Sequence, residues 1–446
     1  MADIVVIGGS AAGLIAAKTA KVMYPDKEVA VIRKEKISMV PCGIPYIFST
    51  LKSVDDDIMG VKPIEDLGVK FIYDEVVDID KDNKEVITKS GDKIKYDKLV
   101  LATGSKPFVP SIEGKDLENI FVVPKDYEYL KNMVEKIKKA KRVAVIGAGF
   151  IGVEVTDEIR KEVEKVYLIE AQNRILPVAF DKDFSEVIEE NLKSKGVEIK
   201  TSKRVKRFIG NGKLERIEFE DGEVIDVDAA ILSVGYKPNV ELAQKLGLFI
   251  GKTGAIWTDE YMRTSEKDIF ACGDCVEHKD FYTRRASRLM LASTATFDAR
   301  IAASNLYGIK MIRENKGNIA IFSSSIEGLT FAAAGLNETM AMEEYFDFVI
   351  GEAQTIDKHP GKLPGTEKIK IKLIFSRSSC VLIGAQILGG RSVGEIINIL
   401  GLAIQKGMTA EELFTMQFGT HPLLTAPPTM YPIVLAAENA MKKMKF

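Results

Sequence analysis

One pattern occurs twice in the chain: a short β-rich run, a glycine-rich turn, a helical stretch and a second β-rich run. The first copy spans residues 3 to 32, with the turn Gly8-Gly9-Ser10-Ala11-Ala12-Gly13. The second copy spans residues 141 to 170, with the turn Gly147-Ala148-Gly149-Phe150-Ile151-Gly152. A strand, a glycine turn and a helix within about 30 residues form the βαβ unit that binds dinucleotides. The sequence therefore predicts an α/β protein with two Rossmann-like domains.

The second copy carries the complete G-x-G-x-x-G spacing. Gly147 permits the tight turn, Gly149 the close approach of a pyrophosphate, and Gly152 the close packing of helix on strand. Glu170 ends the following strand, where a carboxylate accepts ribose hydroxyls and repels a 2′-phosphate. The pattern predicts NADH, and Arg174 leaves NADPH open. The residues assigned to this site are Gly147, Gly149, Phe150, Ile151, Gly152 and Glu170.

The first copy departs from the standard spacing at two places. Ser10 replaces the middle glycine, although it is small enough for a phosphate to approach. The second strand ends in Arg33-Lys34-Glu35 rather than in an acid at the usual position. Either Glu35 or the backbone near Arg33 is expected to serve the ribose, and both alternatives stay open. A tight turn without a ligand is the competing interpretation.

Cys42 lies just beyond the second strand of the first copy, in Pro41-Cys42-Gly43-Ile44-Pro45. In an open α/β sheet, ligands bind in the crevice at the carboxyl ends of the strands. A helix expected at or after Pro45 would stabilise a thiolate near its N-terminus. The alternative is a buried apolar cysteine, as most are. Because no second cysteine lies within a turn, a redox role would need a flavin, oxygen or an external thiol as partner.

The rest of the chain adds a third domain. Strand-like segments at 331–335, 368–375 and 380–388 precede helical ones at 393–406 and 410–418, which predicts an α+β domain. The expected division is 1–115 and 239–325 for the first dinucleotide-binding domain, 116–238 for the second, and 326–446 for the third.

Composition excludes several classes of function. The net charge is −2, from 62 basic and 64 acidic residues, so there is no field to recruit nucleic acid or anionic lipid. No apolar run approaches the roughly 18 residues of a bilayer span, and no basic leader precedes Ile4. A cytoplasmic protein is expected. Four cysteines and three histidines are too few for a disulfide framework, and no metal site is expected.

Several motifs together resemble those of the pyridine nucleotide-disulfide oxidoreductases, over essentially the whole chain. They are the GGSAAG turn, the Cys42 segment from Ser38 to Tyr46, ATG at 102–104, GAGFIG at 147–152, G-x-x-P-N at 235–239 and FACGD at 270–274. The single-cysteine segment is similar to that of the coenzyme A disulfide reductases, NADH oxidases, NADH peroxidases and polysulfide reductases.

The resemblance implies FAD in the first motif, NADH in the second, and a hydrogen bond from Asp274 to the FAD ribityl chain. It also implies a homodimer in which the C-terminal domain completes the partner's active site. The cofactor-binding residues outside the second glycine motif are then Gly8, Ser10, Ala11, Gly13, Arg33, Lys34, Glu35, Cys42, Val77, Ala102, Thr103, Gly104, Gly235, Asp274 and Ala292.

Further positions bear on the reaction that the resemblance implies. Ala11 stands where peroxidases and many oxidases of the family carry a histidine that assists proton transfer, so oxygen or peroxide reduction loses its usual acid. His421 is similar to the catalytic His-Pro histidine of the two-cysteine reductases, and Tyr431 is the alternative acid. The residues predicted to be catalytic are therefore Cys42, His421, Tyr431 and Ser38. Lys18 and Lys21 are candidates for the phosphates of coenzyme A, or are merely a solvated helix face.

Cys272 and Cys275 have the C-x-x-C spacing of redox motifs. Because they flank Asp274 in the flavin-binding turn, they are expected to be small buried residues, with a dithiol or a metal site including His278 as the alternative.

The predicted function is transfer of electrons from NADH through FAD to Cys42, which reduces coenzyme A disulfide, polysulfide or sulfur. One alternative is an NADH oxidase or peroxidase that cycles Cys42 through a sulfenic acid. The others are an electron-transfer flavoprotein reductase and a flavin-based redox sensor.

Overall fold

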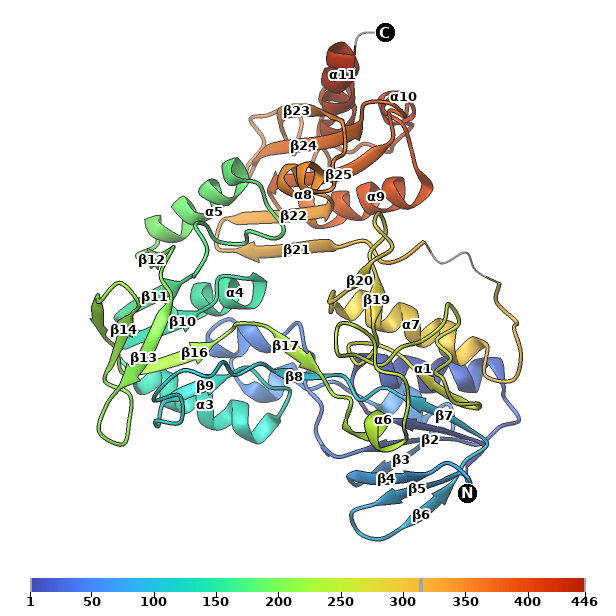
Figure 1. Cartoon of the computed structure of the whole chain (residues 1–446). Helices are drawn as coiled ribbons and strands as arrows, with labels where there is room; N and C mark the ends of the chain where they lie inside the picture. Colours follow the sequence, from blue (N-terminus) through green and yellow to red (C-terminus); the bar gives the residue numbers. More distant parts are fainter. Residues whose placement is uncertain (1, 313–315, 445–446) are drawn as a thin grey trace. The chain divides into compact units, whose positions relative to one another are not determined.

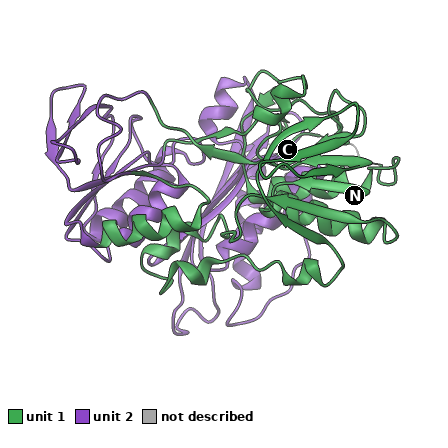
Figure 2. Cartoon of the chain, turned by 90° about the horizontal axis from the view of Figure 1, so that it is seen from below, with its two compact units in different colours: residues 1–110, 121–138, 234–318 green, residues 111–120, 139–233, 319–446 purple. Residues whose placement is uncertain are grey.

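The computed structural model describes residues 2–312 and 316–444. The chain divides into two compact units, shown in two colours in Figure 2. Unit 1 comprises residues 1–110, 121–138 and 234–318, and unit 2 comprises residues 111–120, 139–233 and 319–446. Each unit is therefore assembled from three separate stretches of sequence.

Unit 1 is built around a parallel sheet with the strand order β18-β7-β1-β2-β3. Its strands are β1 (Ile4–Ile7), β2 (Val29–Arg33), β3 (Lys70–Tyr73), β7 (Lys98–Leu101) and β18 (Ile269–Ala271). All four residues of β1 are apolar and buried, as is usual for a parallel sheet covered on both faces. The strand order reverses beside β1, which is where open α/β sheets bind ligands.

Helices α1 (Ala11–Met23) and α7 (Ala292–Ser304) pack against each other on one face of this sheet, as Figure 1 shows. The core on the other face includes side chains from the antiparallel strands β4 and β5. The remaining elements of this unit are η1 (Ile44–Phe48), η2 (Val54–Asp57), α2 (Lys62–Glu65), β4 (Val76–Asp80), β5 (Glu85–Thr88), β6 (Lys93–Lys95), β8 (Ser105–Pro107), β17 (Tyr236–Pro238), α6 (Glu241–Lys245), β19 (His278–Lys279) and β20 (Ala286–Ser287). At the unit boundaries lie β9 (Ile120–Val122) and α3 (Tyr127–Lys139).

Unit 2 begins with a second parallel arrangement, in the order β12-β11-β10-β16. Its strands are β10 (Arg142–Ile146), β11 (Lys165–Ile169), β12 (Glu198–Lys200) and β16 (Ala229–Leu232). Helix α4 (Phe150–Ile159) follows β10, and α5 (Lys182–Ser194) precedes β12. A small antiparallel sheet consists of β13 (Val205–Ile209), β14 (Arg216–Phe219) and β15 (Val224–Asp226).

The C-terminal part of unit 2 is a five-stranded antiparallel sheet in the order β21-β22-β25-β24-β23. Its strands are β21 (Ile321–Ile326), β22 (Leu329–Gly335), β23 (Phe348–Ile356), β24 (Lys368–Ser376) and β25 (Leu382–Gly389). Helix α9 (Val393–Lys406) packs on β21, β22 and β25, and α11 (Pro432–Met444) packs on β23 and β24. The shorter helices are α8 (Glu338–Glu343), α10 (Ala410–Phe414) and η3 (Pro428–Met430). The predicted α/β architecture with a C-terminal α+β region is confirmed.

Three sequence-based boundaries were wrong. The helix expected at 410–418 ends at Phe414, and Thr415 is its C-cap: both the amide and the hydroxyl of Thr415 donate to the Glu411 carbonyl. The strand expected from Cys380 begins at Leu382, because Cys380 sits in a turn with φ of 57°. The helix expected at or after Pro45 is η1, a five-residue 3₁₀ helix that starts at Ile44 and is too short to act as an extended dipole.

No helix among residues 2–312 and 316–444 is long and apolar enough to cross a lipid bilayer.

Candidate active site

The first glycine turn follows β1 and leads into α1, as predicted. Gly8 has φ of +118°, and a β-carbon there would lie 2.1 Å from the carbonyl oxygen of Ala102. A β-carbon on Gly13 would lie 1.9 Å from the carbonyl oxygen of Gly8. The Ser10 side chain makes no capping hydrogen bond to α1. The turn is therefore folded tightly against its neighbours, while the start of α1 has no side-chain cap and fits a phosphate.

Arg33 lies at the strand end where dinucleotide-binding units usually carry an acid for the ribose. Its side chain is only 3% exposed, and a β-carbon on Gly9 would lie 2.5 Å from Arg33 Cδ. The guanidinium donates to the Glu35 carbonyl at 2.6 Å and lies 5.6 Å from the ring centroid of Tyr73. Burial lowers the pKa of Arg33. The side chains of Lys34 and Glu35 are exposed to solvent. The polar atoms beside this turn are the Arg33 guanidinium and the backbone carbonyls of Glu35 and Lys36 to which it donates.

The turn after β18 joins the same region of unit 1. Gly273 has φ of +82°, and a β-carbon there would lie 2.8 Å from the Ala12 methyl and 3.4 Å from the Ala295 methyl. The starts of α1 and α7 thus approach one another at Gly273. Ser105 donates a 2.8 Å hydrogen bond to Asp274 Oδ2, and Lys125 Nζ lies 3.4 Å from the same atom. This convergence fits the FAD that the family resemblance implies for this motif.

The turn at 102–104 is fastened to the chain where it returns at 239. Thr103 Oγ1 donates to the Asn239 carbonyl at 2.7 Å, and the Asn239 side chain donates to the Thr103 carbonyl at 2.9 Å. The backbone amide of Asn239 also donates to the Gly104 carbonyl at 2.9 Å. A β-carbon on Gly104 would meet no atom within 4 Å, which leaves open space beside the turn.

The Cys42 side chain is exposed, and the loop that carries it is held from both sides. Ser38 Oγ donates to the Gly9 carbonyl at 2.9 Å, which fastens the loop to the first glycine turn. Met39 pairs with Ile58, and the Val40 amide donates to the Asp57 carbonyl at 2.9 Å. The Cys42 thiol is therefore exposed to solvent, on a loop that hydrogen bonds hold beside the first glycine turn.

The second glycine turn follows β10 and leads into α4. A β-carbon on Gly152 would lie 1.9 Å from the Gly147 carbonyl oxygen, so helix and turn pack too closely for any side chain. A β-carbon on Gly149 would meet nothing within 4 Å, and Gly149 caps α4 without a side chain. The Glu170 carboxylate accepts the Ala148 amide at 2.8 Å and the Gln172 amide at 2.8 Å. This arrangement fits a pyrophosphate over Gly149 and a ribose at Glu170.

Phe150 and its neighbours face the rest of unit 2. The Phe150 ring stacks on Phe322 with 4.7 Å between centroids, so its backbone rather than its ring is available to a nucleotide. Glu154, one turn along α4, was not singled out from the sequence. Burial raises the pKa of Glu154 to about 7, although its carboxylate accepts a 2.6 Å hydrogen bond from Ser324. The sequence signal that could have identified Glu154 is an acidic residue within an otherwise apolar stretch of the helix.

The two candidate acids belong to unit 2, whereas Cys42 belongs to unit 1. His421 is exposed, and its Nδ1 accepts the Leu423 amide at 3.3 Å, which leaves Nε2 as the protonated nitrogen. Tyr431 is 6% exposed and stacks on Phe418 with 3.9 Å between centroids. Burial raises the pKa of Tyr431, so its phenol stays protonated at neutral pH.

Other predicted residues lie at defined places. Lys18 is exposed on α1, whereas Lys21 Nζ donates to the Pro25 carbonyl at 2.8 Å and caps the end of that helix. Val77 lies on β4 and accepts a hydrogen bond from Lys245 through its carbonyl. Ala292 is the first residue of α7, and Gly235 has φ of +103° before β17.

The C-x-x-C pair is buried, as expected. Cys272 and Cys275 are 0% exposed, and burial raises the pKa of each thiol. His278 does not join them, because its ring nitrogens face the Leu289 carbonyl at 3.0 Å and the Asp298 carboxylate at 2.7 Å. Burial opposes a charged imidazole, but the Asp298 carboxylate outweighs it and raises the pKa of His278.

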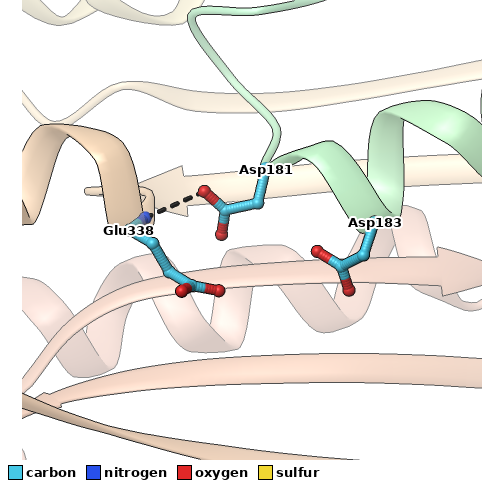
Figure 3. Close-up of side chains that lie close together, drawn as sticks. All are labelled: Asp181, Asp183 and Glu338. Atoms are coloured by element: carbon cyan, nitrogen blue, oxygen red, sulfur yellow. Dashed lines mark hydrogen bonds between the residues drawn. The ribbon is translucent and has the colours of Figure 1, made fainter.

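Three carboxylates of unit 2 lie close enough together to hold a cation: Asp181, Asp183 and Glu338 (Figure 3). Asp181 is the N-cap of α5 and Asp183 lies in its first turn, where a negative charge interacts favourably with the helix dipole. The ammonium of Lys372 already lies among them, 2.7 Å from Asp183, 2.5 Å from Glu338 and 3.5 Å from Asp181. Lys370 also lies 2.7 Å from Asp183, so the cluster is an internal ion network of three carboxylates and two ammonium groups.

Comparison with known proteins gives a consistent picture. Residues 2–299 match the pyridine nucleotide-disulphide oxidoreductase family, and residues 321–431 match its dimerisation domain. The chain is 36% identical to a protein named NADH oxidase from Methanocaldococcus jannaschii, over 99% of both chains. It is 32% identical to a CoA-dependent NAD(P)H sulfur oxidoreductase from Pyrococcus abyssi, over 95% of this chain and 94% of the relative. A solved NAD-dependent persulfide reductase from A. fulgidus superposes with a TM-score of 0.90 at 33% identity, over 99% of this chain and 83% of that one.

Proposed function

Because the chain belongs to the pyridine nucleotide-disulphide oxidoreductases, which use FAD and NAD(P)H, we propose that it reduces a small sulfur–sulfur substrate at Cys42. The substrates in question are coenzyme A disulfide, polysulfide and sulfur. The observation that carries the proposal is an exposed thiol on a loop braced against the first glycine turn by Ser38. Relatives named as sulfur and persulfide reductases support this choice.

Each cofactor has a set of residues suited to it. FAD would be held by the turn at Gly8–Gly13, by the residues near Arg33 and by Asp274, and NADH by the turn at Gly147–Gly152 with Glu170. Bound there, FAD supplies two-electron transfer between a nicotinamide and sulfur. We also propose that residues 1–115 and 239–325 form the FAD domain, residues 116–238 the NADH domain and residues 326–446 the dimerisation domain.

The chain's own residues have separable roles in this proposal. Glu170 accepts the adenosine ribose hydroxyls and disfavours a 2′-phosphate. Cys42 forms a mixed disulfide or persulfide, whose sulfur–sulfur bond accepts two electrons and breaks to leave a Cys42 thiolate. That thiolate attacks the next substrate. His421, in its imidazolium form, or Tyr431 protonates the leaving thiolate across a homodimer interface.

The decisive experiment replaces Cys42 by serine. Cys42→Ser is expected to retain FAD and to be reduced stoichiometrically by NADH, yet to lose turnover of coenzyme A disulfide and polysulfide. Cys380→Ser is the matched control, because Cys380 lies in a turn of unit 2 and should leave turnover unchanged. Full disulfide turnover by Cys42→Ser would overturn the proposal.

A second candidate function is an NADH oxidase, which the name of the Methanocaldococcus relative favours. Ala11 argues against it, because that position offers no imidazole to protonate reduced oxygen. Intact mass spectrometry of the isolated protein separates the two. A coenzyme A or sulfur adduct on Cys42 that NADH removes supports disulfide chemistry, whereas added oxygen supports a sulfenic acid cycle.

A further inference from the structure

His278 and Asp298 form a buried pair in unit 1 to which the proposed reaction gives no role. His278 lies on the short strand β19 and is 5% exposed, and Asp298 lies on α7 and is 1% exposed. Their side chains meet at 2.7 Å, between His278 Nε2 and Asp298 Oδ2. Because desolvation offsets most of the attraction within a buried ion pair, the segments that the pair connects explain it better than stability does.

The pair joins three segments of unit 1. His278 Nδ1 lies 3.0 Å from the carbonyl oxygen of Leu289, just before α7 begins. Asp298 Oδ2 also accepts a 3.3 Å hydrogen bond from the backbone amide of Gly273, in the turn after β18. The pair therefore connects β19, the turn at Gly273, and α7 with the segment that leads into it.

The contacts of the pair lie next to residues assigned to FAD. Asp274 is assigned to the FAD ribityl chain, and Ala292, the first residue of α7, is assigned to FAD as well. The pair holds the amide of Gly273, one residue before Asp274, and the carbonyl of Leu289, three residues before Ala292. It therefore fixes the backbone beside two parts of the proposed cofactor site.

The geometry requires a proton on both ring nitrogens of His278. A carbonyl oxygen can only accept, so Nδ1 must donate to Leu289. Asp298 Oδ2 accepts the Gly273 amide, which favours an ionised carboxylate, so Nε2 donates to Asp298 as well. An imidazolium satisfies both contacts, whereas a neutral ring would turn a lone pair toward one of the two oxygens.

The surroundings of the ring favour the same state. Burial disfavours an imidazolium, but the carboxylates of Asp298 and Asp274 and the Leu289 carbonyl outweigh it and raise the pKa of His278. The ring therefore keeps its second proton to a higher pH than an ordinary histidine does. The titratable and charged groups on the segments around the ring are Asp298 and Arg300 on α7, Cys272, Asp274 and Cys275 at the turn after β18, Lys125 beside Asp274, Glu277, Lys279 and Asp280 on or beside β19, and Arg284, Arg285 and Arg288 beside β20.

We propose that His278, as an imidazolium paired with Asp298, is a positioning residue for FAD. The pair holds the turn before Asp274 to the start of α7, in the arrangement that accepts the cofactor. When the ring releases its second proton to solvent, one of its two contacts becomes repulsive and the turn loses this support. FAD is then released more readily at alkaline pH. This inference rests on the proposed assignment of FAD to this turn and is independent of the chemistry proposed for Cys42.

The test measures FAD release from the FAD-loaded protein between about pH 6 and about pH 10, which covers a raised histidine titration. Freed FAD is separated by ultrafiltration and quantified by its absorbance. In the wild type, release is expected to be slow at neutral pH and to become faster at alkaline pH. His278→Gln cannot hold a second proton. Its release is expected to be about tenfold faster at neutral pH, the effect of losing one hydrogen bond to a charged group, and independent of pH.

The matched control is His359→Gln, which removes a histidine of unit 2 and is expected to match the wild type at every pH. Circular dichroism checks that each variant is folded. Release from His278→Gln at the wild-type rate would overturn the inference. A rise with pH that is the same in His278→Gln and in the wild type would overturn it too, because another group would then be responsible.

Nitrogen NMR of the wild type with isotope-labelled histidine keeps the inference testable if His278→Gln does not fold. The chain has three histidines, so spectra of His359→Gln and His421→Gln identify the remaining signals as those of His278. Both of its ring nitrogens are expected to show imidazolium shifts at neutral pH and to lose them over the pH range in which FAD release rises. A neutral ring at neutral pH would refute the inference. Neither measurement uses turnover, so a failure of the proposed function appears separately, as full disulfide turnover by Cys42→Ser.

Discussion

An alanine at Gly149 is expected to separate nucleotide binding from folding. Gly149 caps α4 with φ of −74° and ψ of −176°, a conformation that alanine adopts, and its β-carbon would meet no protein atom within 4 Å. The cost to folding is then the loss of a favoured N-cap residue, about 1 kcal/mol at most. The added methyl group nevertheless occupies the space assigned to the pyrophosphate. Overpacking of about 1–3 kcal/mol predicts an NADH affinity lowered about 5- to 150-fold.

The matched control lies three residues further along the same motif. A β-carbon on Gly152 would lie 1.9 Å from the Gly147 carbonyl oxygen, an atom of the backbone that cannot rotate away. Gly152→Ala is therefore expected to lower the free energy of unfolding by about 3 kcal/mol or more.

Two measurements on the FAD-loaded protein check this pair of predictions. Calorimetric titration gives the NADH dissociation constant, and urea unfolding gives stability. Gly149→Ala should keep its FAD and lose at most about 1 kcal/mol of stability, while its NADH affinity falls. Wild-type NADH affinity in Gly149→Ala would refute the assignment of the open space to the pyrophosphate, and wild-type stability in Gly152→Ala would refute the packing argument.

Glu170→Gln keeps one acceptor oxygen, enough for the Ala148 amide but not also for the Gln172 amide, and removes the charge that repels a 2′-phosphate. The KM for NADPH should therefore fall about tenfold relative to that for NADH, and an unchanged ratio in steady-state assays would contradict this. Lys372→Met leaves Asp181 and Glu338 without an ammonium partner among the described residues, whereas Asp183 keeps Lys370 at 2.7 Å; it should cost about 3–5 kcal/mol in urea unfolding at pH 7, and a loss below about 1 kcal/mol would show that the network contributes little. Because burial raises the pKa of Asp57 to about 6, folding should weaken by about 2 kcal/mol as pH rises from about 4 to about 7, and stay so at higher pH. Thermal melts of wild type and Asp57→Asn across this range should diverge accordingly, and parallel curves would argue against a buried titrating carboxyl.

The parts of the fold that could be predicted from the sequence are those with a local signal. The two strand–turn–helix units were predicted because glycine spacing and apolar runs lie within about 30 residues, and β1, α1, β10 and α4 follow them. The end of α10 was not predicted, because the first helix-stop residue in the sequence is Gly419, beyond Phe414 where the helix ends.

The candidate site divides in the same way. Cys42 and Gly149 belong to motifs in which the role of a single residue can be predicted. The structure has Cys42 exposed and open space at the Gly149 β-carbon position. Asp57 had no such signal, because three aspartates in a row look equally solvated and only the fold against Gly43 buries the last one. Lys372 meets Asp181 across 191 positions of sequence, a distance over which neither periodicity nor spacing carries information.

The interleaving of the two units has a consequence for how the chain is made. The central strand β1 is synthesised first, but its sheet still lacks β18 and α7 until residue 304 has left the ribosome. By then the whole of residues 139–233, which belong to the other unit, has already emerged. Domains usually fold in the order of synthesis, but here the N-terminal unit must wait for a later one. A nascent chain stalled anywhere before β18 would hold an unfinished sheet edge, and this stretch of synthesis is where a chaperone would have most to protect.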